Sequence, residues 1–233
     1  MMFRPAIFLT KKNSTSMIEV LYEDNHLVIV NKVAGDIVQG DKTKDKPLSE
    51  KIKAYIKNKY NKPGEVYLGT IHRLDRPVSG AIVFAKTSKA LTRMNKMFQD
   101  KTVQKTYWAL CSDEPEEKSG KLIHYLVKDT KKNKTKAHSN EVKNSKKAEL
   151  NYRFIKFKNG KALVEVNPLT GRPHQIRVQL SSIGCIIKGD LKYGAILPNS
   201  DKSIWLHSRK VEFIHPVSNE KISVTAPLPS KNW

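Results

Sequence analysis

An aspartate flanked by two arginines lies in a stretch whose residue types are suited to chemistry. Asp75 is preceded by Arg73 and followed by Arg76. Glycines bound the stretch at positions 69 and 80, as is typical of a loop between two regular elements. Guanidinium groups close to a carboxyl group favour its charged form. We therefore expect an ionised Asp75 that can serve as a nucleophile, a base or a metal ligand, with a purely structural ion pair as the alternative.

Several short motifs follow one another in a recognisable order. Residues 72–75 read His-Arg-Leu-Asp and are followed by Ser79-Gly80, residues 105–107 read Lys-Thr-Tyr, and residues 170–177 read Thr-Gly-Arg-Pro-His-Gln-Ile-Arg. These motifs resemble those of the RluA family of RNA pseudouridine synthases, and residues 189–194 are similar to the family's G-D-x-x-Y-G. The likeness runs from residue 18 to residue 227. Val33 and Val78 depart from the family pattern, which has proline and threonine there.

The resemblance implies an enzyme that converts uridine to pseudouridine within an RNA chain. In this family the aspartate matching Asp75 is catalytic, the arginine matching Arg177 pairs with it, and the tyrosine matching Tyr107 packs on the target base. Aromatic rings fill that stacking role well in RNA recognition. The reaction needs no redox or energy source, so we expect no cofactor and no metal ion. The target uridine has to flip out of its stack to be reached.

Other side chains of the motifs are expected to contact the RNA. The resemblance implies that Arg73 helps to hold the gap that the flipped base leaves. The remaining candidates belong to the motifs or to a lysine-rich run further along the chain: His72, Arg76, Lys105, Arg172, His174, Lys132 and Lys134. For lysines on the surface, ordinary solvation is the alternative to RNA contact.

The composition independently favours a polyanionic partner. Lys and Arg number 43 against 22 Asp and Glu, a formal net charge of +21. Contacts between basic side chains and phosphates release condensed counterions, so the charge favours nucleic acid. The resemblance narrows this expectation to RNA, with tRNA or rRNA as the substrate. No apolar run approaches the roughly 20 residues of a membrane span, and we expect no membrane partner. Cys111 and Cys185 form no C-x-x-C motif, which fits a reducing cytoplasm better than a disulfide framework or a zinc site.

The apolar pattern predicts mainly strands with a few helices. Strands are expected over residues 18–22, 27–30, 81–86, 103–110, 148–157, 162–166, 204–214 and 222–226, and helices over 47–60, 88–100 and from near 173. On the last helix Arg177 lies off the apolar stripe and can reach another element. We predict an α+β fold on a mostly antiparallel sheet. The resemblance implies a bent mixed sheet in two halves, with flanking helices and a central basic cleft.

Residues 17–233 are expected to form one catalytic domain. Residues 1–16 are interpreted as a disordered extension, which leaves no room before residue 18 for the S4 domain that many family members carry. Residues 128–147 hold eight lysines against two acidic residues and almost nothing apolar. This composition predicts a mobile hairpin or loop, either an arm that grips the RNA backbone or a solvated connector.

The combined prediction is an isomerase that acts on specific uridines of tRNA or rRNA. We expect it to work in the cytoplasm as a monomer without an obligate protein partner. One alternative is a non-catalytic RNA-binding or ribosome-assembly protein on the same fold. Another is a hydrolase that uses Asp75 with a metal ion, which the lack of clustered Asp, Glu and His ligands in the sequence disfavours.

Overall fold

A computed structural model describes residues 18–40, 43–230 and 233. The expected extension over residues 1–16 lies outside the described residues. The helices are α1 (Leu48–Lys59), α2 (Ser88–Gln99), α3 (Gln175–Ser182) and the 3-10 helix η1 (Leu191–Tyr193). The strands are β1 (Glu19–Glu23), β2 (Leu27–Lys32), β3 (Gly69–Thr70), β4 (Ser79–Ala85), β5 (Gln104–Cys111), β6 (Ser119–Asp129), β7 (Lys134–His138), β8 (Lys146–Lys158), β9 (Lys161–Pro168), β10 (Leu206–Ile214) and β11 (Lys221–Thr225).

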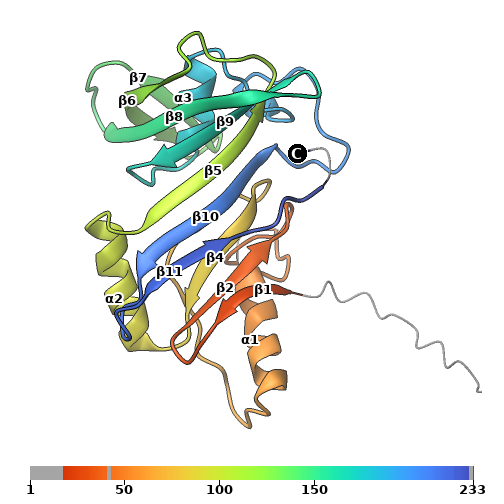
Figure 1. Cartoon of the computed structure of the whole chain (residues 1–233), viewed down its shortest axis with the longest axis vertical. Coiled ribbons are helices and arrows are strands. Elements are labelled where there is room, and N and C mark those ends of the chain that lie inside the picture. Colours follow the sequence, from red (N-terminus) through yellow and green to blue (C-terminus); the bar gives the residue numbers. More distant parts are fainter. Residues whose placement is uncertain (1–17, 41–42, 231–232) are drawn as a thin grey trace, which may run out of the picture.

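The strands form one mixed sheet with two halves (Figure 1). Their order is β1-β2-β4-β10-β5-β9-β8-β6-β7, with β3 paired to β4 and β11 to β10. Within the described ranges the only parallel pairing joins β10 to β4, so the sheet is mostly antiparallel. The predicted α+β class is confirmed. Strands β10 and β5 are central, with β4, β2 and β1 beyond β10 and with β9, β8, β6 and β7 beyond β5.

The predicted elements are present with small shifts at their ends, and three strands were missed. The short β3, the polar β7 and β6, whose apolar residues run together rather than alternate, lack a clear strand pattern in the sequence. Their pairing with neighbouring strands supports them instead. The lysine-rich run over residues 128–147 covers the end of β6, all of β7 and the start of β8. It is thus a paired hairpin, and its mobility stays a prediction. Helix α3 starts at Gln175 because His174 has a left-handed backbone, with φ 55°.

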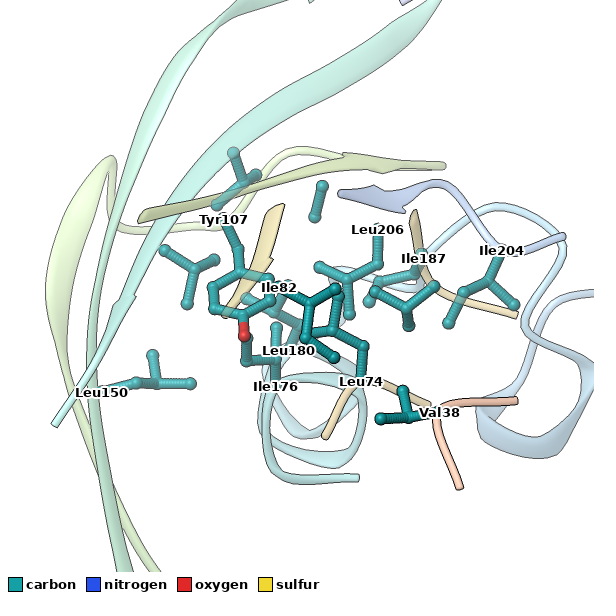
Figure 2. Packing of buried hydrophobic residues seen from close by; sticks show 14 of the residues in the cluster. Val38, Leu74, Ile82, Tyr107, Leu150, Ile176, Leu180, Ile187, Ile204 and Leu206 are labelled. Atoms are coloured by element: carbon teal, nitrogen blue, oxygen red, sulfur yellow. The ribbon is translucent and has the colours of Figure 1, made fainter. Parts of the chain in front are cut away.

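Apolar clusters on the two faces of the sheet hold these elements together. Successive residues of a strand point to opposite faces, so β2 directs Val28 and Val30 to the cluster that includes α1 and α3, and Leu27 and Ile29 to the cluster that includes α2. The first cluster crosses the two halves of the sheet, as Figure 2 shows for its labelled residues. The helix that carries Arg177 therefore packs in the same core as the strands that flank Asp75.

One glycine sets the start of β4. Gly80 has φ +112°, and a Cβ there would lie 2.3 Å from the carbonyl oxygen of Ser208 on β10. Only glycine permits both this backbone and this approach. The Ser-Gly pair of the first motif thus lets β4 meet β10 directly after the Asp75 loop. None of the helices in the part of the chain that the structure describes is long and apolar enough to cross a membrane.

Candidate active site

Asp75 lies in the loop between β3 and β4, and a buried lysine holds the backbone of that loop. Lys32, at the end of β2, is fully buried. Its Nζ donates to the carbonyl oxygens of Val33, Arg76 and Val78 at 3.2, 3.0 and 2.7 Å. The Val78 amide donates to the Asp75 carbonyl at 3.0 Å. The backbone from Asp75 to Val78 is therefore fixed, while the Asp75 side chain is 30% exposed.

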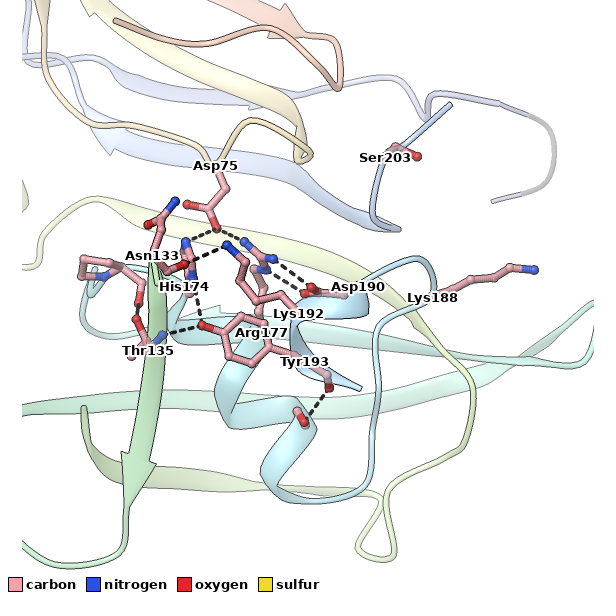
Figure 3. A network of polar contacts seen from close by, with 12 residues as sticks. Asp75, Asn133, Thr135, His174, Arg177, Lys188, Asp190, Lys192, Tyr193 and Ser203 are labelled. Carbon is pink, nitrogen blue, oxygen red and sulfur yellow. Dashed lines mark hydrogen bonds and ion pairs between the residues drawn. The ribbon is translucent and has the colours of Figure 1, made fainter. Parts of the chain in front are cut away.

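Arg177 of α3 joins Asp75 to a second carboxylate, Asp190 (Figure 3). Its Nη1 donates to Asp75 Oδ2 at 2.8 Å, and its Nε and Nη2 donate to Asp190 Oδ2 and Oδ1 at 2.7 and 2.8 Å. The side chains of Arg177 and Asp190 are only 6% and 1% exposed. Burial alone would lower the pKa of Arg177, but the hydrogen bonds and charge of Asp190, with the charge of Asp75, raise it above its ordinary value. Arg177 therefore stays a cation.

The Nε–H and Nη2–H groups of Arg177 bind the two oxygens of Asp190, and an Nη1–H group binds Asp75. Two parallel hydrogen bonds between a planar guanidinium group and a carboxylate fix the orientation of the guanidinium group, in addition to balancing its charge. Asp75 accepts from Arg177 through Oδ2, and the described residues provide no hydrogen-bond partner for Oδ1. Asp75 thus presents one oxygen with free lone pairs on a side chain whose position is fixed by its other oxygen.

A cleft of about 770 Å³ contains Asp75, a volume within the range of small-molecule sites. It brings together residues of all the motifs from both halves of the sheet. The predicted site residues that line it are His72, Arg73, Asp75, Arg76, Lys105, Tyr107, Arg172, His174 and Arg177. Lys132 and Lys134 lie outside this lining, and Lys134 Nζ lies 5.7 Å from the ring centroid of Tyr193.

Tyr107 on β5 faces the cleft with most of its ring buried. It is 8% exposed and belongs to the same apolar cluster as Leu74 and Ile176 (Figure 2). Burial raises the pKa of Tyr107 to about 12, a hydrogen bond with Ser208 lowers it and the charge of Asp75 raises it. The phenol therefore keeps its hydrogen at neutral pH.

The three arginine candidates differ in how far they are already engaged. Arg73 is exposed and has no hydrogen bond or ion pair within the described ranges. Arg76 pairs with Asp45 at 2.6 Å. Arg172 donates from Nε to the Lys147 carbonyl oxygen at 3.1 Å. Arg73 is thus available to a ligand without the loss of a protein contact.

His72 and Lys105 form part of the wall of the cleft. His72 Nε2 accepts from the Val83 amide at 3.1 Å, and its ring stacks on Phe98 with centroids 4.8 Å apart. Lys105 Nζ lies 5.3 Å from the Phe98 ring centroid. Burial, with the nearby charge of Lys105, lowers the pKa of His72 to about 3. His72 is therefore neutral at pH 7 and adds no charge to the wall of the cleft.

Several residues of the site received no role from the sequence. Asp190 and Tyr193 lie in the stretch similar to G-D-x-x-Y-G, which marked the region without indicating their function. Lys192 and Asn133 line the cleft and are joined by a hydrogen bond of 2.8 Å from Nζ to the Asn133 carbonyl. Lys32 simply continues the apolar strand β2, so no pattern identified it. In the described part of the chain no cluster of three or more His, Cys, Asp and Glu side chains is able to hold a metal ion.

Comparison with known proteins agrees with this geometry. Residues 26–182 match the family model described as RNA pseudouridylate synthase. The ribosomal large subunit pseudouridine synthase C of Vibrio cholerae is 31% identical over 96% of this chain and 70% of its own length. An uncharacterized RNA pseudouridine synthase of Bacillus subtilis is 31% identical over 91% of this chain and 69% of its own length.

A solved structure shows the same fold. Human RNA pseudouridylate synthase domain containing 4 superimposes with a TM-score of 0.75 at 24% identity, covering 91% of this chain and 88% of that one. The match of the family model covers more than half of the chain, and it includes Asp75, Tyr107 and Arg177. The chain therefore belongs to the RNA pseudouridylate synthase family and is an enzyme that isomerises uridine to pseudouridine in RNA.

Proposed function

We propose that this enzyme modifies uridines of large-subunit ribosomal RNA and that Asp75 is its catalytic carboxylate. The observation that carries the second part is the 2.8 Å ion pair between Asp75 and Arg177, which are 102 residues apart and meet in a basic cleft. The choice of RNA rests on relatives named ribosomal large subunit pseudouridine synthase C in Vibrio cholerae and Buchnera aphidicola. The net charge of +21 fits either RNA class.

The reaction exchanges one bond to the ribose for another. The N1–C1′ bond breaks, a C5–C1′ bond forms, the hydrogen on C5 leaves as a proton and N1 gains a proton. Asp75 Oδ1 acts at the ribose, as a nucleophile on C1′ or as a base on an adjacent C–H. Arg177 holds Oδ2 and orients the carboxylate. The ring of Tyr107 packs on the uracil while it turns, and its hydroxyl group assists the transfer of the C5 proton.

The RNA has to open for this chemistry. Flipping a nucleotide out of its stack costs a few kcal/mol, which protein contacts offset. Arg73 is exposed and lines the cleft, and in this proposal it fills the gap that the flipped base leaves in the RNA. The other proposed RNA contacts line the cleft or lie on the β6–β7 hairpin: His72, Arg76, Lys105, Arg172, His174, Lys132 and Lys134.

The same proposal covers the organisation of the protein. Residues 17–233 act as one catalytic domain, with residues 128–147 as the arm that grips the RNA backbone. The enzyme works as a monomer in the cytoplasm, where ribosomal RNA and reduced thiols are found. In support, Cys111 and Cys185 are free thiols, and exposed apolar residues are spread over the chain, with Phe157 on β8, Ile214 on β10, and Ile196 and Leu197 in the loop after η1. Sedimentation of the full chain at assay concentration tests this, and a dimer would refute it.

The choice of RNA is tested with two transcripts, large-subunit ribosomal RNA and a tRNA pool, each carrying tritium at uridine C5. Forming the C5–C1′ bond expels that hydrogen, so tritium released to water reports the reaction directly. We expect release from the ribosomal transcript alone. Release from the tRNA pool alone would overturn the proposed substrate. Release from neither would overturn the proposed function and favour the non-catalytic RNA-binding alternative.

A further inference from the structure

His174 points at the catalytic carboxylate from the start of α3. Its Nε2 lies 3.9 Å from Asp75 Oδ2, and its side chain is 8% exposed. Its backbone is left-handed, with φ 55° and ψ 19°. For a residue other than glycine this conformation costs on the order of 1 kcal/mol, and such residues gather at functional sites. This backbone conformation directs the imidazole from the start of α3 toward the Asp75 loop.

Tyr193 determines which nitrogen of His174 carries the proton. Its hydroxyl oxygen lies 2.8 Å from the amide nitrogen of Thr135 and 2.8 Å from His174 Nδ1 (Figure 3). An amide N–H can only donate, and the Thr135 hydroxyl group donates to the Pro173 carbonyl oxygen, so we assign the phenol hydrogen to the bond with the imidazole. Burial raises the pKa of Tyr193, so this hydrogen is retained at neutral pH. His174 Nδ1 therefore accepts.

The proton of His174 then lies on the other nitrogen. A neutral imidazole has one N–H, and with Nδ1 accepting it is Nε2–H, which faces Asp75. Burial lowers the pKa of His174 to about 4. Among the charges that face it, Asp75 raises this pKa while Arg177, Lys192 and Lys128 lower it. The ring is thus neutral at pH 7.

The network also ties His174 to the lysine-rich hairpin. Thr135 lies on β7, and besides its amide bond to Tyr193 its hydroxyl group donates to the Pro173 carbonyl oxygen at 3.0 Å. Contacts that the hairpin makes with RNA phosphates therefore act on the residues that hold the imidazole in place. The Tyr193 ring also packs 5.1 Å from the guanidinium carbon of Arg177.

We propose that His174 is a positioning residue that donates from Nε2–H to Asp75 Oδ2 when RNA occupies the cleft, with Tyr193 selecting the required tautomer. Arg177 and His174 then hold the same oxygen, and Oδ1 alone faces the ribose. The separation of 3.9 Å shortens on substrate binding, as is common for hydrogen bonds of free enzymes. The inference rests on the proposed role of Asp75 and gives His174 a function beyond contact with RNA.

The first test is nuclear magnetic resonance of the full chain labelled with nitrogen-15 in histidine. The His174 signals are assigned by their loss in His174→Gln. We expect an unprotonated Nδ1 and a protonated Nε2 in the native protein, and a shift of population toward Nδ1–H in Tyr193→Phe. Tyr67→Phe is the matched control, because Tyr67 is 46% exposed and lies outside the cleft. A protonated Nδ1 in the native protein would overturn the inference.

The second test separates positioning from RNA binding by single-turnover kinetics. Since hydrogen bonds to charged groups are involved, we expect His174→Ala to lower the rate constant of the chemical step by about 10- to 100-fold. Loss of the proposed RNA contact should weaken RNA affinity by a smaller factor. His174→Gln retains an N–H donor and should recover most of the rate. An unchanged rate with weaker RNA affinity in His174→Ala would overturn the inference. If the native protein modified no RNA, the proposed function would fail, and the tautomer measurement would still decide the state of His174.

Discussion

The Asp75 loop and the turn at residues 189–194 each give one carboxylate to Arg177, and they do so differently. Asp190 is 1% exposed and uses both oxygens on the guanidinium group, whereas Asp75 is 30% exposed and uses one. A buried ion pair adds little net stability because desolvation opposes it, but it fixes direction. The anchored pair aims the remaining N–H of Arg177, so that the exposed carboxylate is oriented without being buried.

Because Arg177 binds both carboxylates, we expect Arg177→Lys to have the largest effect on activity among the changes to neighbours of Asp75 that test this comparison. The ammonium group of lysine is a point charge and cannot donate two parallel hydrogen bonds to Asp190 while also donating one to Asp75. Because misplacing a catalytic group by about 1 Å costs on the order of 100-fold, we expect at least that loss in kcat/KM. Arg153→Lys is the matched control, since Arg153 forms a surface pair with Glu165 at 2.9 Å. Near-native activity of Arg177→Lys would show that the bidentate anchor is dispensable.

Tyr107 lines the same cleft as Asp75, so its variants test the proposed chemistry on the exposed side of the Arg177 pair. Tyr107→Phe removes only the hydroxyl group, and we expect kcat to fall about 100-fold, a typical loss for one proton-transfer group, with KM little changed. Tyr107→Leu also removes the stacking surface, which is worth roughly 1–3 kcal/mol per base, and should weaken RNA binding. Steady-state kinetics separate the two effects. Equal KM values for the Phe and Leu variants would exclude stacking.

Stability measurements distinguish the two carboxylates directly. Asp190→Asn replaces the buried carboxylate with a neutral amide, so that Arg177 loses its buried counter-charge. We expect the free energy of unfolding to fall by about 3 kcal/mol. Asp75→Asn removes a partly exposed charge and should cost much less. Urea unfolding of both variants beside Asp113→Asn, at an exposed aspartate, provides the comparison. Equal losses for Asp75→Asn and Asp190→Asn would refute the division between anchor and reacting group.

The smallest expected effect concerns Lys32, which holds the backbone of the Asp75 loop. Burial lowers the pKa of Lys32 from 10.5 to about 8, with the charges of Asp36 and Asp75 opposing this shift. The unfolded chain therefore binds this proton more tightly than the folded one, and the contribution of Lys32 to stability rises as the pH increases from 8 to 10.5.

Lys32→Met lacks this rise, whereas Lys57→Met, at an exposed lysine, retains it. The measurement is the free energy of unfolding at pH 7 and pH 9, compared among the native protein and the two variants. Between these pH values the native protein should gain stability relative to Lys32→Met. Parallel changes in all three proteins would show that Lys32 is not a buried cation.

The sequence predicted the parts of the site that local motifs encode, and missed those that depend on the fold. The motifs identified Asp75, Tyr107 and Arg177, and the apolar pattern placed α3, so the Asp75–Arg177 pair was expected. The role of Lys32 was not, because a lysine that closes an apolar strand has no distinctive spacing. Its partners are backbone carbonyl groups of a distant loop, and the tautomer of His174 likewise depends on Tyr193 and Thr135, which only the folded chain brings together.

The central claim is that Asp75 reacts while its neighbours position it. The most direct test measures tritium release from C5-labelled ribosomal RNA by the native protein, Asp75→Asn and Asp113→Asn, with folding checked by circular dichroism. We expect Asp75→Asn to lose at least about 10⁴-fold in rate, since its amide can neither attack C1′ nor take a proton, while Asp113→Asn stays near native. Near-native release by folded Asp75→Asn would contradict the account.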